Sequence, residues 1–337
     1  MILAGDIGGT NTRLALFDDE LLKKHEQMFV NQGREGQGEQ GGLTEIVREF
    51  LGAAKDAGVA GKVERATFGV AGPVKEGRAS MTNLPWKLDE RELARELKIA
   101  KVALINDLVA HGEGIELLRP EQLITIQAGE VVHGNRAVIA AGTGLGEGGI
   151  FWDSAQGGGG RGRYRAFASE GGHSDFAPRD DRQIALLRFL REKYPNASWE
   201  RVLSGPGLRN IYEFLVRPDQ LGPSAALVEG EITPSKISEA GMKGTNAACV
   251  EALELFVAFY GAEAANLALK VMATGGVYLG GGIAPNIVAK LNSATFIDAF
   301  LATGPQNIRE ILRKIPIHLV NFELNGLYGA ANFAAHL

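Results

Sequence analysis

Three glycine-rich turns of this chain could bind phosphate. The first, Gly5-Asp-Ile-Gly-Gly-Thr-Asn11, lies between two apolar, strand-like runs. Glycine supplies the positive φ that tight hairpin turns use, and without a Cβ it lets backbone N–H groups approach a phosphate closely. Asp6 places a carboxylate where it could hold Mg²⁺ through water, although a turn without any ligand is the alternative. The candidate phosphate-binding residues of this turn are Gly8, Gly9, Thr10 and Asn11.

The second and third turns lie in the middle and late parts of the chain. Ala141-Gly-Thr-Gly-Leu-Gly146 joins two strand-like segments, and Gly280–Gly282 precedes a predicted helix start at Ala284. The second turn formally matches G-x-G-x-x-G, but a dinucleotide fingerprint must open a helix and this one continues into a strand. The chain contains no G-x-x-x-x-G-K-[ST]. We expect phosphates at the first two turns and adenosine beside the third, with Gly142, Thr143, Gly144 and Gly281 as the candidate contacts.

Asn106 and Asp107 end a predicted strand and open a predicted helix, Leu108–Leu118. Ligands of α/β sheets bind at the carboxyl ends of strands. An aspartate at that place could accept the proton of a hydroxyl that attacks a phosphoryl group. The alternative is that Asp107 only caps the helix, because aspartate is a favourable N-cap residue.

Glu170 and His173 are separated by two glycines, which permit close backbone approach to a small ligand. A carboxylate and an imidazole can both hydrogen-bond to neighbouring hydroxyl groups. A metal site is a poorer interpretation, because no further ligands are close in sequence. A purely structural hydrogen bond of His173 within the turn is the remaining alternative.

Several motifs, in this order, carry a family resemblance. The chain resembles the bacterial ATP-dependent glucokinases of the actin-like sugar kinase superfamily, from residue 2 to about residue 330. The most specific motifs are Ser169-Glu-Gly-Gly-His173 and Glu200-Arg-Val-Leu-Ser-Gly-Pro-Gly-Leu208. The other motifs are Gly5-Asp-Ile-Gly-Gly-Thr-Asn-Thr-Arg13, Asn83-Leu-Pro-Trp86, Leu104-Ile-Asn-Asp107, Ala141-Gly-Thr-Gly-Leu-Gly146 and Asp175-Phe-Ala-Pro178.

The resemblance implies an α/β, two-lobe, actin-like ATPase (ribonuclease H-like) fold with mixed sheets flanked by helices. It implies transfer of the γ-phosphoryl of ATP, with Mg²⁺, to the 6-hydroxyl of D-glucose at the entry to glycolysis, and a homodimer. It makes Asp107 the catalytic base. The residues that would position the sugar are Asn106, Glu170, His173 and Glu200, with Asn83 as a further candidate.

Alternatives remain for both the site and the function. Glu200 could be a surface charge of a helix, Asn83 could only shape its turn, and Trp86 is better explained by packing than by sugar stacking. A kinase for another hexose or an amino sugar, a donor such as ADP or polyphosphate, and a non-catalytic sugar sensor are possible on the same scaffold. Retention of Asp107 beside an intact phosphate hairpin argues against the sensor.

Composition sets further limits. The chain has 337 residues, a length typical of about two domains. Its net charge is −5, and no basic run indicates nucleic-acid binding. We find no signal-peptide pattern and expect no apolar stretch of membrane-spanning length. The single cysteine, Cys249, excludes an intramolecular disulfide and the cysteine-rich zinc site of the related repressor–kinase family, and fits a reducing cytoplasm.

The elements that must position these residues follow from hydrophobic periodicity. Strands over 2–6, 13–17 and 26–31 should form an antiparallel meander around the first turn, and 67–71 and 102–105 should be buried strands. We expect helices over 43–57, 89–97, 246–272 and 324–335, and flexible loops at 33–42 and 157–160. The expected lobes are 1–116 with 321–337, which carry the first hairpin and Asp107, and 117–320, which carry the second hairpin with the sugar and adenosine contacts.

Overall fold

The computed structural model describes residues 1–32, 42–59, 61–81, 84–154, 162–226 and 231–337. Asn83, most of the expected loop at 33–42 and the loop at 157–160 lie outside the described residues. The chain forms two compact units. The first contains residues 1–120, 164–168 and 322–337, and the second contains 121–163 and 169–321.

The first unit is built on a mixed five-stranded sheet in the order β3-β2-β1-β4-β8. The two pairs that involve β2 are antiparallel, which confirms the predicted meander, whereas β1–β4 and β4–β8 are parallel. A separate three-stranded sheet has the order β5-β6-β7. The strands of this unit are β1 (Ile2–Ile7), β2 (Asn11–Phe17), β3 (Lys23–Val30), β4 (Arg65–Val70), β5 (Val74–Lys75), β6 (Arg78–Ser80), β7 (Lys87–Asp89) and β8 (Lys101–Asn106).

Helices cover both faces of this sheet, because residues alternate between the two faces of each strand. Leu3 and Ile7 of β1 belong to the core that contains α1, whereas Ile2 and Ala4 belong to the core that contains α11. Trp86 is 1% exposed in the first of these cores, which confirms its packing role. The helices of this unit are α1 (Leu43–Asp56), α2 (Glu90–Leu97), α3 (Asp107–Gly114), α11 (Asn325–Ala335) and the 3-10 helix η1 (Ile115–Leu117).

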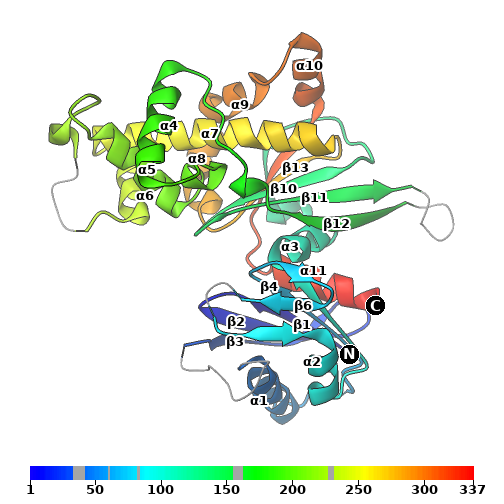
Figure 1. Ribbon diagram of the computed structural model, residues 1–337. Coiled ribbons are helices and arrows are strands. Elements are labelled where there is room, and N and C mark those ends of the chain that lie inside the picture. The colour runs from blue at the N-terminus through cyan, green and yellow to red at the C-terminus, as the bar shows by residue number, and fades with distance from the viewer. Residues whose placement is uncertain (33–41, 60, 82–83, 155–161, 227–230) are drawn as a thin grey trace. The chain divides into compact units, whose positions relative to one another are not determined.

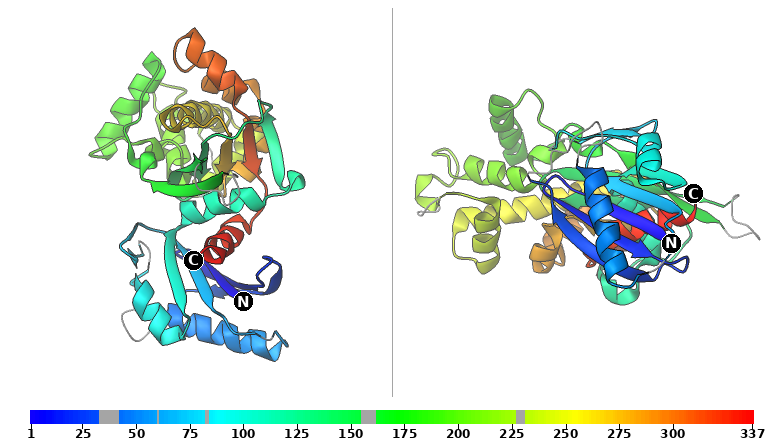
Figure 2. Two further views of the ribbon diagram at one scale, coloured as in Figure 1. Left: turned by 90° about the vertical axis from the view of Figure 1, so that its right-hand side faces the viewer. Right: turned by 90° about the horizontal axis from the view of Figure 1, so that it is seen from below.

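The helix predicted over 108–118 is therefore two elements. The α-helix α3 begins one residue earlier, at Asp107, and ends at Gly114, and the chain then continues as the 3-10 helix η1. The last helix, α11, packs on α3 and β1. Figure 2 (left) shows this C-terminal helix, in red, beside the sheet of the first unit.

The second unit contains a mixed six-stranded sheet in the order β12-β11-β10-β13-β14-β9. Its first five strands repeat the order of the first unit: a hairpin at one side, followed by two parallel neighbours of the hairpin's first strand. The second glycine turn therefore has the same topological place as the first. The strands are β9 (Leu123–Gln127), β10 (Arg136–Ala141), β11 (Leu145–Asp153), β12 (Arg163–Ser169), β13 (Val277–Gly280) and β14 (Ile317–Val320).

The helices of the second unit surround the long helix α7 (Ala247–Val271), which is drawn in yellow in Figure 1. The predicted start at Ala284 is a 3-10 helix, η6. The other α-helices are α4 (Asp181–Lys193), α5 (Gly205–Leu215), α6 (Pro234–Lys243), α8 (Val288–Leu291), α9 (Ala294–Leu301) and α10 (Gln306–Lys314). The 3-10 helices are η2 (Pro120–Gln122), η3 (Gly171–His173), η4 (Trp199–Arg201), η5 (Pro223–Ala225) and η6 (Ala284–Ile287).

The helix α7 is the one described helix whose length and composition could cross a membrane, which differs from our expectation. Burial accounts for its apolar composition, because 72% of its most apolar window is buried. Phe256, Phe259 and Tyr260 of this helix are at most 1% exposed and lie in the main core of the second unit.

The contact between α11 and α3 gives a test of the packing that holds Asp107. A Cβ at Gly329 would lie 1.7 Å from the carbonyl oxygen of Ala110, whereas one at Gly326 would meet its nearest neighbour, an atom of His111, at 3.5 Å. We expect Gly329→Ala to lower the free energy of unfolding by at least about 1–3 kcal/mol, because the helices must separate. The matched Gly326→Ala should be neutral or stabilising by up to about 1 kcal/mol, through its helix propensity. Equal effects of the two variants in chemical denaturation would contradict this packing.

Candidate active site

The first glycine turn is held in shape by a buried asparagine. Gly8 N–H donates to the carbonyl oxygen of Asn11 at 2.9 Å, which closes the turn. Asn31, which is 2% exposed, donates from Nδ2 to the Gly8 carbonyl and from its backbone N–H to the Thr10 carbonyl, both at 2.8 Å. Thr12 Oγ1 donates to Asn31 Oδ1 at 2.8 Å. These contacts leave the side chains of Thr10 and Asn11 exposed.

The prediction that Gly8 and Gly9 supply a positive φ is wrong, since neither of these described residues has one. The bracing by Asn31 shapes the turn instead. A Cβ at Gly8 would lie 3.2 Å from the carbonyl oxygen of Asn11, so the close backbone approach is what favours glycine there. Sequence analysis missed Asn31, because the residue follows a strand by itself and matches no motif.

Asp6 and Asp107 come from neighbouring parts of the sheet. Asp6 lies opposite Gly69 of β4, and the next residue of β4, Val70, lies opposite Asn106 at the end of β8. A Cβ at residue 69 would lie 4.0 Å from Asp107 Cα and 3.6 Å from the Gly5 carbonyl oxygen, so a glycine allows this close approach. The carboxyl end of the parallel strands therefore carries both carboxylates.

Asn106, rather than Asp107, is the N-cap of α3. Asn106 Oδ1 accepts from Leu108 N–H at 2.9 Å, and its Nδ2 donates to the Gly72 carbonyl at 3.1 Å. Asp107 is the first residue of the helix, and its Oδ1 also accepts from Leu108 N–H at 2.9 Å. Since the cap is already supplied by Asn106, capping is not enough to explain an aspartate at position 107.

Burial raises the pKa of Asp107 above its ordinary value of 3.8, and the charge of Asp6 acts in the same direction. His111, one helical turn later, lowers that pKa. Asn325 of α11 donates from Nδ2 to the His111 carbonyl at 2.9 Å and lies 3.3 Å from His111 Nδ1. Sequence analysis treated His111 as an ordinary packing residue, although its i,i+4 spacing from Asp107 was a usable signal.

The second glycine turn is joined to Glu200. Gly142 N–H donates to the Gly144 carbonyl at 2.9 Å, which closes the turn between β10 and β11. Leu145 N–H donates to Glu200 Oε2 at 3.1 Å. A Cβ at Gly144 would lie 2.6 Å from the same oxygen, so only glycine leaves room for this carboxylate. Glu200 is therefore no free surface charge: 20% of its side chain is exposed, in the 3-10 helix η4.

Three of the predicted sugar-binding side chains lie together in the second unit. His173 Nε2 lies 3.9 Å from Glu170 Oε2, and His173 Nδ1 lies 4.0 Å from Glu200 Oε1. Glu170 and His173 expose 69% and 59% of their side chains, so both can reach a ligand. Two carboxylates that flank an imidazole offer hydrogen-bond acceptors and one adaptable partner, which suits a polyhydroxyl ligand.

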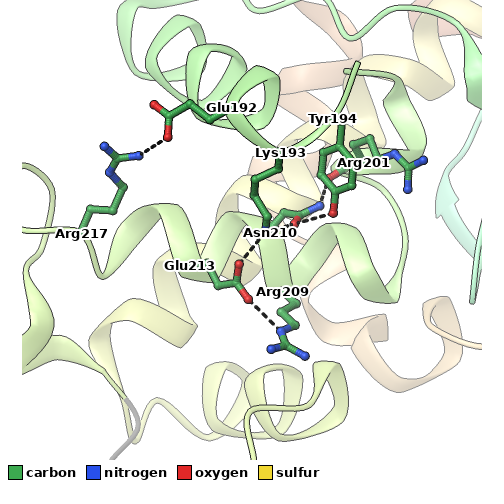
Figure 3. Close-up of polar contacts among 8 residues, drawn as sticks. All are labelled: Glu192, Lys193, Tyr194, Arg201, Arg209, Asn210, Glu213 and Arg217. Atoms are coloured by element: carbon green, nitrogen blue, oxygen red, sulfur yellow. Dashed lines mark hydrogen bonds and ion pairs between the residues drawn. The ribbon is translucent and has the colours of Figure 1, made fainter. Parts of the chain in front are cut away.

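A polar cluster on α4 and α5 fixes the element that carries Glu200 (Figure 3). Asn210, which is 3% exposed, donates from Nδ2 to the carbonyl oxygen of Arg201 at 3.0 Å. Its Oδ1 accepts from Lys193 Nζ at 2.9 Å and from the Tyr194 hydroxyl at 3.1 Å. The Arg201 guanidinium stacks 4.4 Å from the ring centre of Tyr194. Glu213 and the pair Glu192–Arg217 add ion pairs at the exposed side of the cluster.

A cavity of about 640 Å³ in the second unit adjoins the second glycine turn. Its volume falls in the range of small-molecule sites. The first residues of α5 form part of its wall, and Gly205 N–H donates to the Gly142 carbonyl at 2.8 Å. The cavity is lined by Gly142, Thr143, Gly205, Pro206, Leu208, Pro234, Ser235, Ser238, Glu239, Met242, Lys243, Gly282, Ile283 and Asn286.

The third glycine cluster reaches this cavity through Gly282, whereas Gly281 packs beneath the turn. Gly281 has a φ of +82°, and a Cβ there would lie 2.3 Å from the Ala141 carbonyl oxygen. The wall formed by α6 was missed in the sequence, because its residues belong to an ordinary amphipathic helix that matches no nucleotide-binding motif.

Comparisons with known proteins agree with this arrangement. A family model described as Glucokinase matches residues 3–337. The glucokinase of Nostoc sp. is 39% identical over 100% of this chain and 99% of its own. That of Synechocystis sp. is 38% identical over 99% and 97%. The chain belongs to the glucokinase family. It is thus an ATP-dependent hexose kinase, as the resemblance in its motifs implied.

Solved glucokinase structures share the fold. The crystal structure of glucokinase from an Antarctic psychrotroph has a TM-score of 0.82 and 28% identity, and the match covers 100% of this chain and 99% of that one. A ROK family glucokinase from Streptomyces griseus, solved in complex with glucose and AMPPNP, has a TM-score of 0.64 and 21% identity over 100% and 99%. The predicted two-lobe α/β kinase fold with mixed sheets is therefore confirmed.

The polar cluster gives a test of how the glucokinase scaffold holds Glu200. Asn210→Ala leaves the buried Arg201 carbonyl without its donor, so we expect the free energy of unfolding to fall by about 1–3 kcal/mol. The KM for glucose should rise more than the KM for ATP, because η4 loses its anchor. Glu192→Gln, which breaks only the exposed pair with Arg217, is the control and should change neither constant measurably. A glucose KM that stays within twofold of the wild-type value in Asn210→Ala would contradict the anchoring role.

Proposed function

We propose that this chain transfers the γ-phosphoryl of MgATP to the 6-hydroxyl of D-glucose, with Asp107 as the general base. The observation that carries the base assignment is the position of Asp107 at a strand's carboxyl end, with a raised pKa and with helix capping supplied by Asn106. A buried carboxylate of raised basicity is suited to accept the proton of an attacking hydroxyl. In-line attack then needs positioning and charge stabilisation more than covalent chemistry.

We assign the remaining contacts to two groups. Asn106, Glu170, His173 and Glu200 would hold the sugar, and the three hydroxyl-binding side chains of the second unit lie within about 4 Å of one another. Asn83 stays a prediction outside the described residues. Phosphates and adenosine would be bound by Gly8, Gly9, Thr10, Asn11, Gly142, Thr143 and Gly144, with Gly281 below the adenosine cavity.

Mg²⁺ would neutralise charge on the phosphates, and Asp6 is its candidate protein partner. Asp6 lies close enough to Asp107 for its charge to raise the pKa of Asp107, and a cation held there would relieve this repulsion. Within the described residues no group of three or more His, Cys, Asp or Glu side chains could hold a metal ion. Mg²⁺ keeps several waters and binds mainly to substrate phosphates, which fits a single carboxylate acting through water.

We further propose a cytoplasmic homodimer that supplies glycolysis. A buried, unpaired Cys249, whose pKa burial raises to about 11, fits a reducing compartment. The alternative substrate, another hexose or an amino sugar, would change only the contacts of Glu170, His173 and Glu200. A coupled ADP-release assay with a panel of sugars and donors tests the proposal directly: strong preference for glucose and ATP is expected. A clear preference for another sugar or donor, or no turnover, would contradict it.

Asp107→Asn should lower kcat by roughly 10²–10⁴, because an amide cannot accept the proton. Glucose affinity should change much less. Asp181→Asn is a matched control, because Asp181 is also the first residue of a helix but is exposed. A purified Asp107→Asn variant that keeps more than about a tenth of the wild-type kcat would show that Asp107 is structural.

The same assignment predicts a pH dependence. Since burial raises the pKa of Asp107, the ionised base is lost as the pH falls through that raised value, and kcat/KM should fall with it. Charged His111 lowers this pKa, so His111→Gln should move the acid limb of kcat/KM to higher pH. An acid limb that moves to lower pH in this variant would contradict the assignment.

Glu170→Gln and His173→Ala should raise the KM for glucose roughly 10- to 100-fold, since a hydrogen bond to a charged group contributes about 1.5–3 kcal/mol. The KM for ATP should stay within a few-fold. Glu251→Gln, a change in a partly exposed carboxylate paired with Arg182, is the control. If the ATP KM rises and the glucose KM does not, these residues belong to the nucleotide site.

A further inference from the structure

Two buried carboxyl groups of the second unit have no part in the proposed reaction. Glu147 on β11 is 1% exposed, and Glu263 on α7 is fully buried. Neither oxygen of Glu147 accepts a hydrogen bond from an N–H or O–H donor within the described residues. A buried carboxylate in such surroundings is costly, and the usual remedy is to retain the proton.

Glu263 is the member of the pair that is stabilised as an anion. Asn266 Nδ2 donates to Glu263 Oε2 at 2.7 Å, and Lys270 Nζ lies 3.3 Å from Oε1. Glu147 hydrogen-bonds to Glu263 and has no cation of its own, so the shared proton belongs to Glu147. Burial, followed by the charge of Glu263, raises the pKa of Glu147 to about 8.

The Glu147 carboxyl lies directly against the loop that carries Glu170 and His173. A Cβ at Gly171 would lie 2.2 Å from Glu147 Oε2, and one at Gly172 would lie 2.2 Å from the Leu145 carbonyl oxygen. The two glycines between Glu170 and His173 thus rest on β11 without any intervening side chain. Displacement of the Glu147 carboxyl must therefore move the backbone between the two candidate sugar contacts.

We propose that Glu147 is a positioning residue for glucose: as a neutral acid hydrogen-bonded to Glu263, it supports Gly171 and keeps Glu170 and His173 in place. This inference rests on the proposed roles of Glu170 and His173. Ionisation of Glu147 places a second negative charge against Glu263, and the repulsion displaces the supporting carboxyl. Glucose binding then weakens as the pH rises through the value at which Glu147 loses its proton.

Other charged groups near the pair define the electrostatic setting. The guanidinium of Arg179 interacts with Glu263 over a longer range, and Ile139, opposite Glu147 on β10, is uncharged. The sugar loop contributes the two exposed groups that flank Gly171. The charged residues on the elements around Glu147 are Glu263 and Lys270 on α7, Glu170 and His173 beside η3, Arg179, and Arg163 and Arg165 on the neighbouring strand β12.

The test measures the KM for glucose and for ATP from pH 6.5 to 9.5 in the full-length enzyme and its variants. In the wild type, the glucose KM should rise above about pH 8, by up to about tenfold per pH unit for one proton, while the ATP KM changes less. Glu147→Gln, which stays neutral and can donate to Glu263, should keep a low glucose KM to pH 9.5. Glu147→Leu, which cannot donate, should raise the glucose KM about tenfold or more at every pH.

Two further variants fix the cause. Glu263→Gln removes the anion that raises the pKa of Glu147, so the rise in glucose KM should begin at lower pH. Glu254→Gln alters another α7 carboxylate, one paired with Lys290, and should follow the wild-type profile. A rise that persists unchanged in Glu147→Gln, or a wild-type glucose KM in Glu147→Leu, would overturn the proposal.

Thermal unfolding provides a readout that does not depend on activity. The folded wild type holds a proton up to about pH 8, whereas the unfolded chain releases it near 4.5, so wild-type stability must fall relative to Glu147→Gln between these values. The difference in Tm between Glu147→Gln and wild type should therefore increase from pH 5 to pH 8. A constant difference would show that folded Glu147 is ionised and would overturn the proposal. If Glu170→Gln leaves the glucose KM unchanged, the proposed glucose site fails; if only the Glu147 series fails, this inference alone is wrong.

Discussion

The hydrogen bond from Leu145 N–H to Glu200 Oε2 joins the second phosphate turn to the candidate glucose contacts. It forms because Gly144 leaves space for the carboxylate, and because η4 is held in place by Asn210. The next residues of the same strand support the glycines between Glu170 and His173. The first three residues of β11 thus bear on both halves of the candidate site in this unit. Any movement of this strand must be felt by sugar and phosphate contacts together.

Both phosphate turns depend on bracing from outside the hairpin. In the first unit the brace is a side chain, Asn31, which bonds the carbonyls of Gly8 and Thr10. In the second it is the start of α5, through Gly205 N–H and the Gly142 carbonyl. In each case the outside group satisfies carbonyl oxygens of the turn, which leaves N–H groups free to face an anion. The shared strand order of the two sheets explains why equivalent turns recur.

The parts of the fold that were predictable from sequence were those with strong periodicity. The meander around the first turn, the long core helix α7 and the final helix follow from apolar spacing, and the motifs led to the glucokinase family. The failures have separate causes. Positive φ at Gly8 and Gly9 was inferred from turn chemistry, whereas tertiary bracing by Asn31 decides the conformation. The break after Gly114 follows from the tight contact of this glycine with Asn325, which is distant in sequence.

The candidate site was predictable only where a motif carried it. The proximity of Glu170, His173 and Glu200 agrees with the motifs, although their roles stay predictions. Asn31, Asn210 and the Glu147–Glu263 pair act through buried contacts between distant segments, and a single sequence contains no signal for such contacts. The α6 wall of the cavity was missed for the same reason.

Amide hydrogen exchange in the presence of glucose alone tests the central claim, that β11 connects the sugar contacts to the second phosphate turn. If Glu200 is held by glucose, its bond to Leu145 N–H should be stabilised, and exchange in a peptide covering residues 142–147 should slow without any nucleotide. The loop at 169–174 should be protected at the same time. Protection of 169–174 with unchanged exchange in 142–147, at saturating glucose, would contradict the connection.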